Sequence, residues 1–280
     1  LYIFLGSLSV VTVCGNLLVI TSIIYFKQLH TPTNSLVLSL AMADLLVGVL
    51  VFPFSMAFSL SLCLYQENIF CKIRDSFDIT LCTSSIMHLC CISIDRYYAV
   101  CQPLTYTTKI NHNAAVVMIL VSWTASVTIG NCFTFVKLEK HSVNVVANTM
   151  SFVFAFYLPV IIMLCIYLKI FFVAQRQARS IQNTKSGATV SKMESKATKT
   201  LAIVMGVFLM CWFPFFFCVT ILTLIVSVPI PVLETLNWFV LSNSTLNPFI
   251  YAFFYSWFRS AFRLIISGKI FQGDFSISKL

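Results

Sequence analysis

The sequence predicts an all-α membrane protein, a seven-transmembrane helix bundle followed by a short amphipathic eighth helix. Of its 280 residues, 59% are hydrophobic and only 10% are charged, whereas a soluble domain carries about 25% charged residues. The mean hydropathy is +0.93. Long stretches without a charge recur along the chain, and about 20 apolar residues are enough for a helix to cross the hydrocarbon core of a bilayer.

Seven stretches have the length and character of spanning helices. Pro229 and Pro231 separate the sixth from the seventh, and the polar stretch 176–191 is typical of a solvated loop between the fifth and the sixth. Short connections are expected at 27–33 and 100–112. The predicted helices are 1–26, 34–60, 71–99, 113–136, 146–175, 192–226 and 231–254.

The pattern divides the chain into two parts. Residues 1–254 are expected to form the seven-transmembrane domain, and residues 255–280 a membrane-surface helix and a cytoplasmic tail. In the second part, Phe258 lies between apolar neighbours and the basic residues Arg259 and Arg263. This amphipathic pattern suits a short helix that lies on a membrane surface.

Lysine and arginine are divided unequally between the two ends of the predicted helices. Fourteen fall on the side of the C-terminal tail and four on the other, so we expect a cytoplasmic C-terminus, an extracellular N-terminus and a multi-pass protein of the plasma membrane. The net charge of +9 fits anionic lipid headgroups. Because the basic residues are spread over separate loops, nucleic acid is not an expected partner. The chain starts at Leu1 with an apolar run long enough to span, so we expect no cleavable signal peptide and a missing N-terminal segment.

The third predicted helix carries charge only near its ends. Asp78 and Arg96 are 18 residues apart, which is five helical turns and about 27 Å. They therefore share one face of the helix and lie at opposite membrane boundaries, with Asp78 on the outer side.

Asp78 is the more informative of these two residues, because an isolated carboxylate is costly in hydrocarbon. No lysine or arginine lies at its depth in any predicted helix. An ammonium group of a ligand would supply both the missing charge and hydrogen-bond donors. The alternative is a solvated residue at the start of the helix, as Asp75 is expected to be, and the spacing alone leaves both open.

Aromatic residues favour a ligand pocket near the same level. Pro214 lies inside the sixth predicted helix, where it kinks the axis, and Trp212, Phe215 and Phe216 lie within about one turn of it. Aromatic faces attract cations. Ordinary packing is the alternative, but a kink, an aromatic cluster and a lone acid together favour a pocket.

Deeper in the predicted bundle, Asp44 is accompanied by other polar residues in apolar spans. Oxygen-rich sites of this kind hold hard cations, so a sodium site and a water-filled polar network are both open. The accompanying residues are Asn16, Ser85, Asn243, Ser244 and Asn247.

A switch is expected at the cytoplasmic end of the third helix. Asp95-Arg96-Tyr97 lies where a helix C-terminus favours a cation, and Glu194 at the start of the sixth predicted helix is placed to pair with Arg96. A pair that breaks on activation would be a two-state element. A static ion pair is the alternative.

Taken together, these residues resemble those of rhodopsin-like (class A) G-protein-coupled receptors along nearly the whole chain. The run Asn243–Phe258 is also similar to the helix-seven signature of the trace amine-associated receptor subfamily. The motifs occur in order on the predicted helices: Gly15-Asn16, Leu40-Ala41-Met42-Ala43-Asp44, Asp95-Arg96-Tyr97, Trp123, Pro159 with Tyr167, Cys211-Trp212-Phe213-Pro214, and Asn247-Pro248-Phe249-Ile250-Tyr251.

The resemblance implies a receptor for small biogenic or volatile amines that signals through a stimulatory G protein to cyclic AMP. Many relatives act in olfaction. It implies no enzymatic activity and no cofactor beyond a possible sodium ion near Asp44.

The resemblance also assigns roles by position. Asp78 would anchor the amine, Cys82 would line the pocket floor, and Ser151 would hydrogen-bond a ring hydroxyl. The other ligand-binding positions are Trp212, Phe215, Phe216, Trp238 and Leu241. The activation switch would comprise Asp95, Arg96, Tyr167, Glu194, Asn247, Pro248 and Tyr251. Pro103 and Leu104 would contact the G protein, and the sodium site would comprise Asp44, Ser85, Asn243 and Asn247.

The chain departs from the family pattern in its extracellular part. The second extracellular loop is about twenty residues shorter than in relatives, so Cys71 lacks its usual partner and is expected to be unpaired or bonded to Cys63 or Cys132. Leu241 stands where amine receptors have a tyrosine that hydrogen-bonds the anchoring aspartate.

Three alternative functions follow from these observations. Another aminergic subtype, such as a serotonin-like receptor, shares the fold, but the helix-seven signature argues against it. A poorly functional receptor would follow from the shortened loop. A transporter is the least favoured, because the acids lie at separate depths and no internal repeat is visible.

Overall fold

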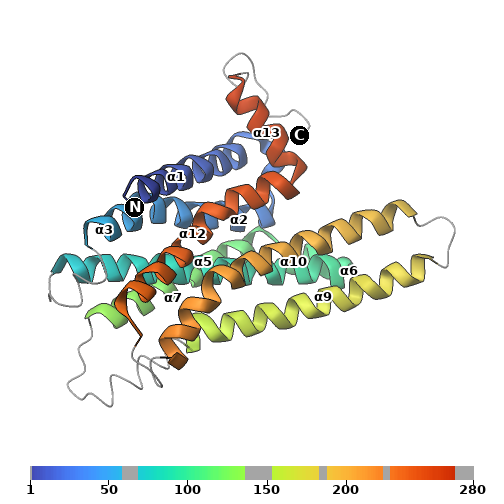
Figure 1. Cartoon of the computed structure of the whole chain (residues 1–280). Coiled ribbons are helices and arrows are strands. Elements are labelled where there is room, and N and C mark those ends of the chain that lie inside the picture. The colour runs from blue at the N-terminus through green and yellow to red at the C-terminus, as the bar shows by residue number, and fades with distance from the viewer. Residues whose placement is uncertain (1, 59–68, 136–152, 183–187, 223–227, 269–280) are drawn as a thin grey trace.

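The protein is a bundle of long helices, here in a computed structural model (Figure 1). The structure describes residues 2–58, 69–135, 153–182, 188–222 and 228–268, and the side chains are left undescribed at 133, 135, 177–182, 188–202, 221, 222 and 256. Its elements are α1 (Tyr2–Tyr25), η1 (Lys27–Leu29), α2 (Pro32–Leu46), η2 (Val47–Val51), α3 (Phe52–Ala57), α5 (Ile69–Cys101), α6 (Pro103–Lys109), α7 (His112–Phe135), η3 (Val153–Tyr157), α9 (Leu158–Gln182), α10 (Ala188–Phe217), η4 (Cys218–Leu222), α12 (Ile230–Phe254) and α13 (Ser256–Ile266).

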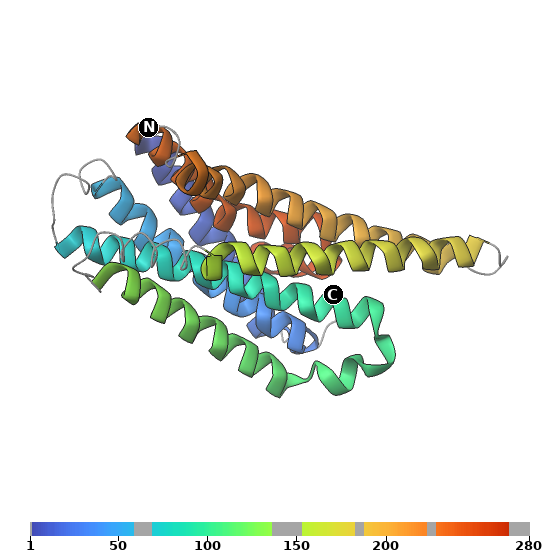
Figure 2. The same cartoon turned by 90° about the horizontal axis from the view of Figure 1, so that it is seen from below.

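Helix α5 occupies the middle of the bundle. It contacts α2, α7, α9 and α12, while α1 packs against α2 and α12 on one side, and α9 and α10 pair on the other. Figure 2 shows α9 running along the outside of the bundle toward the end that also carries α6. Residues of α5 can therefore face several helices at once.

Six helices of the described chain are long and apolar enough to cross a membrane. The seventh predicted span, α12, has 25 residues but lower hydropathy, because it carries many polar side chains. Asn243, Ser244, Thr245 and Asn247 are all buried. Its polar residues thus point into the bundle, so that α12 completes the seven-helix architecture.

Proline and π-helical turns occur together in three spans. A proline ring clashes with the carbonyl four residues earlier, and a wider π turn is one way to accommodate such a disturbance. The π turn Val47–Val51 comes just before Pro53, and Val153–Tyr157 comes just before Pro159. Pro214 lies inside α10, shortly before the π turn η4. The predicted kink in this helix therefore has a local backbone cause.

Two connections differ from the sequence prediction. The polar stretch 176–191 was expected to be a loop, but α9 continues to Gln182 and α10 begins at Ala188. The prediction was wrong for these residues because Gln, Ala, Arg and Lys are good helix formers and a helix beyond the bilayer need not be apolar. The connection 100–112 contains α6, which begins at Pro103, a favourable first helical residue.

The eighth helix, α13, is present as the amphipathic pattern predicted. Phe258 and Ala261 are buried against the end of α1. Arg259 donates hydrogen bonds to the last carbonyls of α12, at Ala252 and Phe253. This side chain caps α12 where α13 turns away from it (Figure 1).

We expect Gly15→Val to destabilise the bundle. A Cβ at Gly15 would lie 3.0 Å from the Cβ and Cγ of Pro248, and a rigid proline ring cannot move aside. Overpacking of this kind costs about 1–3 kcal/mol. Thermal unfolding of purified protein would measure the loss. Gly6→Val is the matched control on the same helix, since nothing lies within 4 Å of its Cβ position; equal losses in both variants would contradict the prediction.

Candidate functional site

Asp78 lies on the part of α5 that faces α12. Its Oδ1 accepts a hydrogen bond from Cys82 Sγ at 3.2 Å, and the side chain of Asn237 on α12 forms a second hydrogen bond. Neither partner carries a charge. The residue is only half-buried, so that part of it remains accessible.

The nearest cation on the same helix is already paired. Arg74 is 4% exposed, and its guanidinium donates to the Asp75 carboxylate at 2.9 and 2.6 Å and to the Phe58 carbonyl at 3.0 Å. Asp75 is therefore ion-paired rather than simply solvated, with its side chain 41% exposed. Within the described part of the chain, Asp78 forms no salt bridge.

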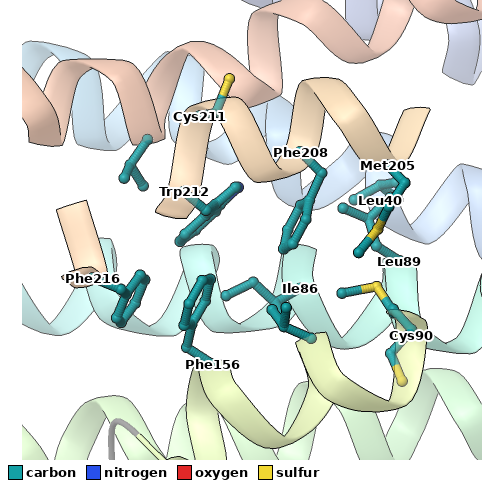
Figure 3. Close-up of a cluster of buried hydrophobic side chains, with 13 residues drawn as sticks. Leu40, Ile86, Leu89, Cys90, Phe156, Met205, Phe208, Cys211, Trp212 and Phe216 are labelled. Atoms are coloured by element: carbon teal, nitrogen blue, oxygen red, sulfur yellow. The ribbon is translucent and has the colours of Figure 1, made fainter. Parts of the chain in front are cut away.

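An aromatic stack lies between η3 and α10 (Figure 3). The rings of Phe156 on η3 and Phe216 on α10 are parallel, with centroids 3.8 Å apart, and Trp212 follows 6.0 Å from Phe216. Phe215 meets Phe216 edge to face. Cys82 packs against the hydrophobic cluster that contains this stack, and the same side chain donates to the Asp78 carboxylate. The structure thus places four predicted ligand-binding residues in or against one cluster, namely Cys82, Trp212, Phe215 and Phe216.

Leu241 and Trp238 lie in a second apolar cluster with Phe52 and Leu81. Leu241 is 1% exposed, and the Trp238 ring lies 5.8 Å from that of Phe52. A leucine here cannot hydrogen-bond Asp78. Asn237, one turn earlier on the same face of α12, makes that bond instead. The sequence analysis missed Asn237, although its spacing of four residues from Leu241 was a usable signal.

Asp44 is the centre of a buried polar cluster. Its Oδ1 accepts hydrogen bonds from Ser85 Oγ at 3.1 Å and Ser244 Oγ at 2.7 Å, and its Oδ2 accepts one from Asn247 Nδ2 at 2.7 Å. Asn16 joins the cluster by donating to the Ser244 carbonyl at 3.1 Å. Helices α1, α2, α5 and α12 therefore meet at one carboxylate.

The cluster fits a small hard cation in part. The carboxylate, the two serine hydroxyls and the unpaired Oδ1 of buried Asn16 are oxygen atoms of the kind such ions prefer. Asn247, by contrast, turns a nitrogen donor toward Asp44. The Nδ2 of Asn243 is buried without a hydrogen-bond partner. Of the four predicted sodium ligands, Ser85 and Asn247 contact Asp44.

At the opposite end of α5, Arg96 is held by its own neighbour. It forms a salt bridge with Asp95, which is 0% exposed, and donates a hydrogen bond to Thr33 Oγ1 at 2.7 Å. Tyr106 Oη donates to Asp95 Oδ1 at 2.9 Å. We call Asp95, Arg96, Thr33 and Tyr106 the Asp95 lock. It joins α5 to α2 and α6.

The sequence analysis missed Thr33 and Tyr106, because both lie in stretches taken as connections or helix starts. Thr33 Oγ1 donates to both oxygens of Asp95 at 3.0 Å. The Tyr106 hydroxyl is protonated at neutral pH, since a tyrosine pKa is ordinarily about 10, and burial raises its pKa further. Glu194, the predicted partner of Arg96, lies on α10 where side chains are not described.

The other predicted switch residues have separate partners. Tyr167 accepts a hydrogen bond from Ser93 at 3.1 Å, and Tyr251 packs with residues of α1, α2 and α13. Pro248 lies against Gly15. A relay from Arg96 to these tyrosines therefore stays a prediction. Pro103 and Leu104 lie on α6, and Leu104 is 95% exposed.

Three predictions concern the extracellular part of the chain. Cys71 is disulfide-bonded, whereas Cys132 is a free, exposed thiol. Of the three alternatives left open by the sequence, an unpaired Cys71 and a bond to Cys132 are therefore excluded. Cys63, Ser151 and the shortened loop lie outside the described residues.

The side chain of buried His88 is hydrogen-bonded at both ring nitrogens, as expected for a residue that stabilises the fold. Its Nδ1 donates to the Ser84 carbonyl at 2.7 Å and its Nε2 accepts from Ser39 Oγ at 2.7 Å. Trp123 Nε1 donates to the same hydroxyl at 3.0 Å. This hydrogen-bond chain ties α2, α5 and α7 together.

Comparison with known proteins agrees with this architecture. Residues 15–251 match the family described as 7 transmembrane receptor (rhodopsin family). The chain belongs to this family of G-protein-coupled receptors, and is a receptor rather than an enzyme.

Its relatives define the subfamily more closely. The chain is 46% identical to trace amine-associated receptor 1 of Macaca mulatta and 44% identical to that of Homo sapiens, in each case over 100% of the chain and 91% of the relative. It is 42% identical to trace amine-associated receptor 4 of Mus musculus, over 88% of that protein. The sequence places it with the trace amine-associated receptors.

Proposed function

We propose that the chain is a plasma-membrane receptor for small biogenic or volatile amines, with Asp78 as the anchor for the ligand ammonium. The single observation that carries the proposal is the environment of the Asp78 carboxylate. It is a half-buried carboxylate with neutral hydrogen-bond partners, and one of them, Cys82, packs against the hydrophobic cluster that contains the aromatic stack. A desolvated carboxylate in such a place gains from a cation, and aromatic faces attract the same charge. The names of the relatives support an amine.

The proposal includes orientation and coupling. The uneven distribution of lysine and arginine supports an extracellular N-terminus and a cytoplasmic C-terminus. On that orientation, Asp78 faces outward, while the Asp95 lock and exposed Leu104 face the cytoplasm, where a heterotrimeric G protein of the stimulatory type would bind. The amphipathic helix α13 would lie on the cytoplasmic membrane surface.

The experiment that tests this function measures cyclic AMP in cells that display the chain. The panel comprises trace monoamines, volatile amines and serotonin, with surface protein quantified in parallel. A rise with trace or volatile amines supports the proposal. A response to serotonin alone favours the serotonin-like alternative. Silence across the panel, with protein at the surface, contradicts the amine assignment, whereas absence from the surface favours a poorly functional receptor.

We also propose that Asp44, with the Ser85 and Ser244 hydroxyls, holds a sodium ion. The ion would supply positive charge to the buried carboxylate. We expect sodium to stabilise purified receptor relative to choline at equal ionic strength, by about 1.4 kcal/mol at ten times its Kd. Asp44→Asn should abolish this difference, since an amide is nearly isosteric but cannot neutralise a cation. A difference in thermal unfolding that persists in Asp44→Asn would overturn the sodium site.

A further inference from the structure

A shallow, open surface depression of about 450 Å³ lies along one side of α9, near its C-terminal half, and all of its lining residues belong to that helix. Its lining residues follow one another at helical spacing and form a single stripe, which we call the α9 groove. The stripe is mostly apolar, and Leu168 and Phe172 are 55% and 63% exposed. The lining residues are Cys165, Leu168, Lys169, Phe172, Val173 and Arg176.

Two cations lie along the α9 groove, Lys169 near its middle and Arg176 at the end that faces the cytoplasm in the orientation proposed above. Lys169 and Arg176 are seven residues apart, which places them on one face of α9 about 10 Å apart along its axis. The Lys169 ammonium lies 5.1 Å from the centroid of the Tyr97 ring on α5. Neither cation forms a salt bridge within the part of the chain that the structure describes. Both side chains are exposed.

We propose that the α9 groove binds an anionic phospholipid of the cytoplasmic leaflet. Leu168 and Phe172 would contact an acyl chain, and the Lys169 ammonium and the Arg176 guanidinium would bind the phosphate and the acidic headgroup. The charge complementarity selects the lipid: a basic pair at the membrane boundary attracts an anionic headgroup, whereas a zwitterionic one brings no net charge. The proposed lipid site is separate from the amine site at Asp78 and from the Asp95 lock.

The exposed thiol of Cys165 gives a local probe of occupancy. Purified full-length chain in detergent is treated with N-ethylmaleimide, and alkylation of each cysteine is followed by peptide mass spectrometry. Phosphatidylserine should slow alkylation of Cys165 about threefold when present at twice its Kd. Phosphatidylcholine should leave the rate unchanged. Exposed Cys132 on α7 is the internal reference, and its rate should stay constant.

Matched variants separate a specific site from general charge. Lys169→Gln with Arg176→Gln should abolish the protection, whereas Lys27→Gln with Lys109→Gln removes the same charge from exposed positions off α9 and should preserve it. Equal protection by the two lipids, or protection that survives in the first pair, overturns the proposal. Equal protection by soluble glycerophosphoserine overturns it too, since the groove would then bind the phosphate without the lipid. The readout uses no amine, so it does not depend on the proposed ligand.

Discussion

Asp78→Ala is expected to abolish amine-evoked cyclic AMP while leaving the protein at the cell surface. Among the residues that the structure describes, Cys82 and Asn237 are the hydrogen-bond partners of the Asp78 carboxylate, so its removal leaves two neutral donors there and no unpaired charge. A bound ammonium, by contrast, would lose its counter-ion. Truncating one partner of a buried charge pair costs about 2–5 kcal/mol, which corresponds to an EC50 about 30-fold to more than 1,000-fold higher. Concentration–response curves with surface protein measured in the same cells test this.

Asp78→Asn is the matched variant, because it keeps the size of the side chain and removes only its charge. Its response should fall nearly as far as that of Asp78→Ala. A potency within a few-fold of the parent in Asp78→Asn would show that charge is not what holds the ligand. A loss of surface protein in both variants would show instead that Asp78 acts in folding.

Asp95→Asn is expected to raise basal cyclic AMP about fivefold or more, the lower end of typical coupling between conformational states. Asp95 is fully buried and holds Arg96, Thr33 and Tyr106 at once. An amide cannot form the salt bridge, so Arg96 loses its pairing with Asp95, and α6 is held less firmly through Tyr106. Basal cyclic AMP per surface receptor, without any amine, is the measurement.

Two further variants locate the switch. Tyr106→Phe removes the hydroxyl that contacts Asp95 and Thr33 but keeps the Arg96–Asp95 salt bridge, so its basal signal should lie between those of the parent and Asp95→Asn. Glu194→Gln tests the pairing predicted from the sequence. If Glu194→Gln raises the basal signal about fivefold while Asp95→Asn stays at the parent level, the lock on Arg96 lies on α10 instead.

Much of the architecture could be predicted from the sequence, because the bilayer restricts the possible structures. A spanning segment must satisfy its own backbone hydrogen bonds, so charge-free stretches of sufficient length predicted helices. The amphipathic pattern around Phe258 predicted α13 in the same way. The depth of Asp44, Asp78 and Asp95 also followed, since the rise of a helix fixes position along its axis.

Helix ends outside the apolar stretches could not be predicted in this way. Residues 176–182 and α6 lie beyond the apolar stretches, where a helix need not be hydrophobic. Their polar sequences therefore led to the wrong prediction of loops. Asn237 was missed because a single asparagine in a polar helix looks like its neighbours. Only the packing of α12 against α5 places it beside Asp78.

The sequence by itself therefore determined the number of helices, the acidic residues that they carry, and the depth of each acidic residue in the membrane. The tertiary structure decided the partners of those acids. Asp44 receives hydroxyls from α5 and α12, and Arg96 pairs with adjacent Asp95 and with Thr33 of α2. The physical reason is that axial depth follows from spacing within one helix, whereas a hydrogen bond between helices depends on their rotation and separation, which the packing of the whole bundle sets.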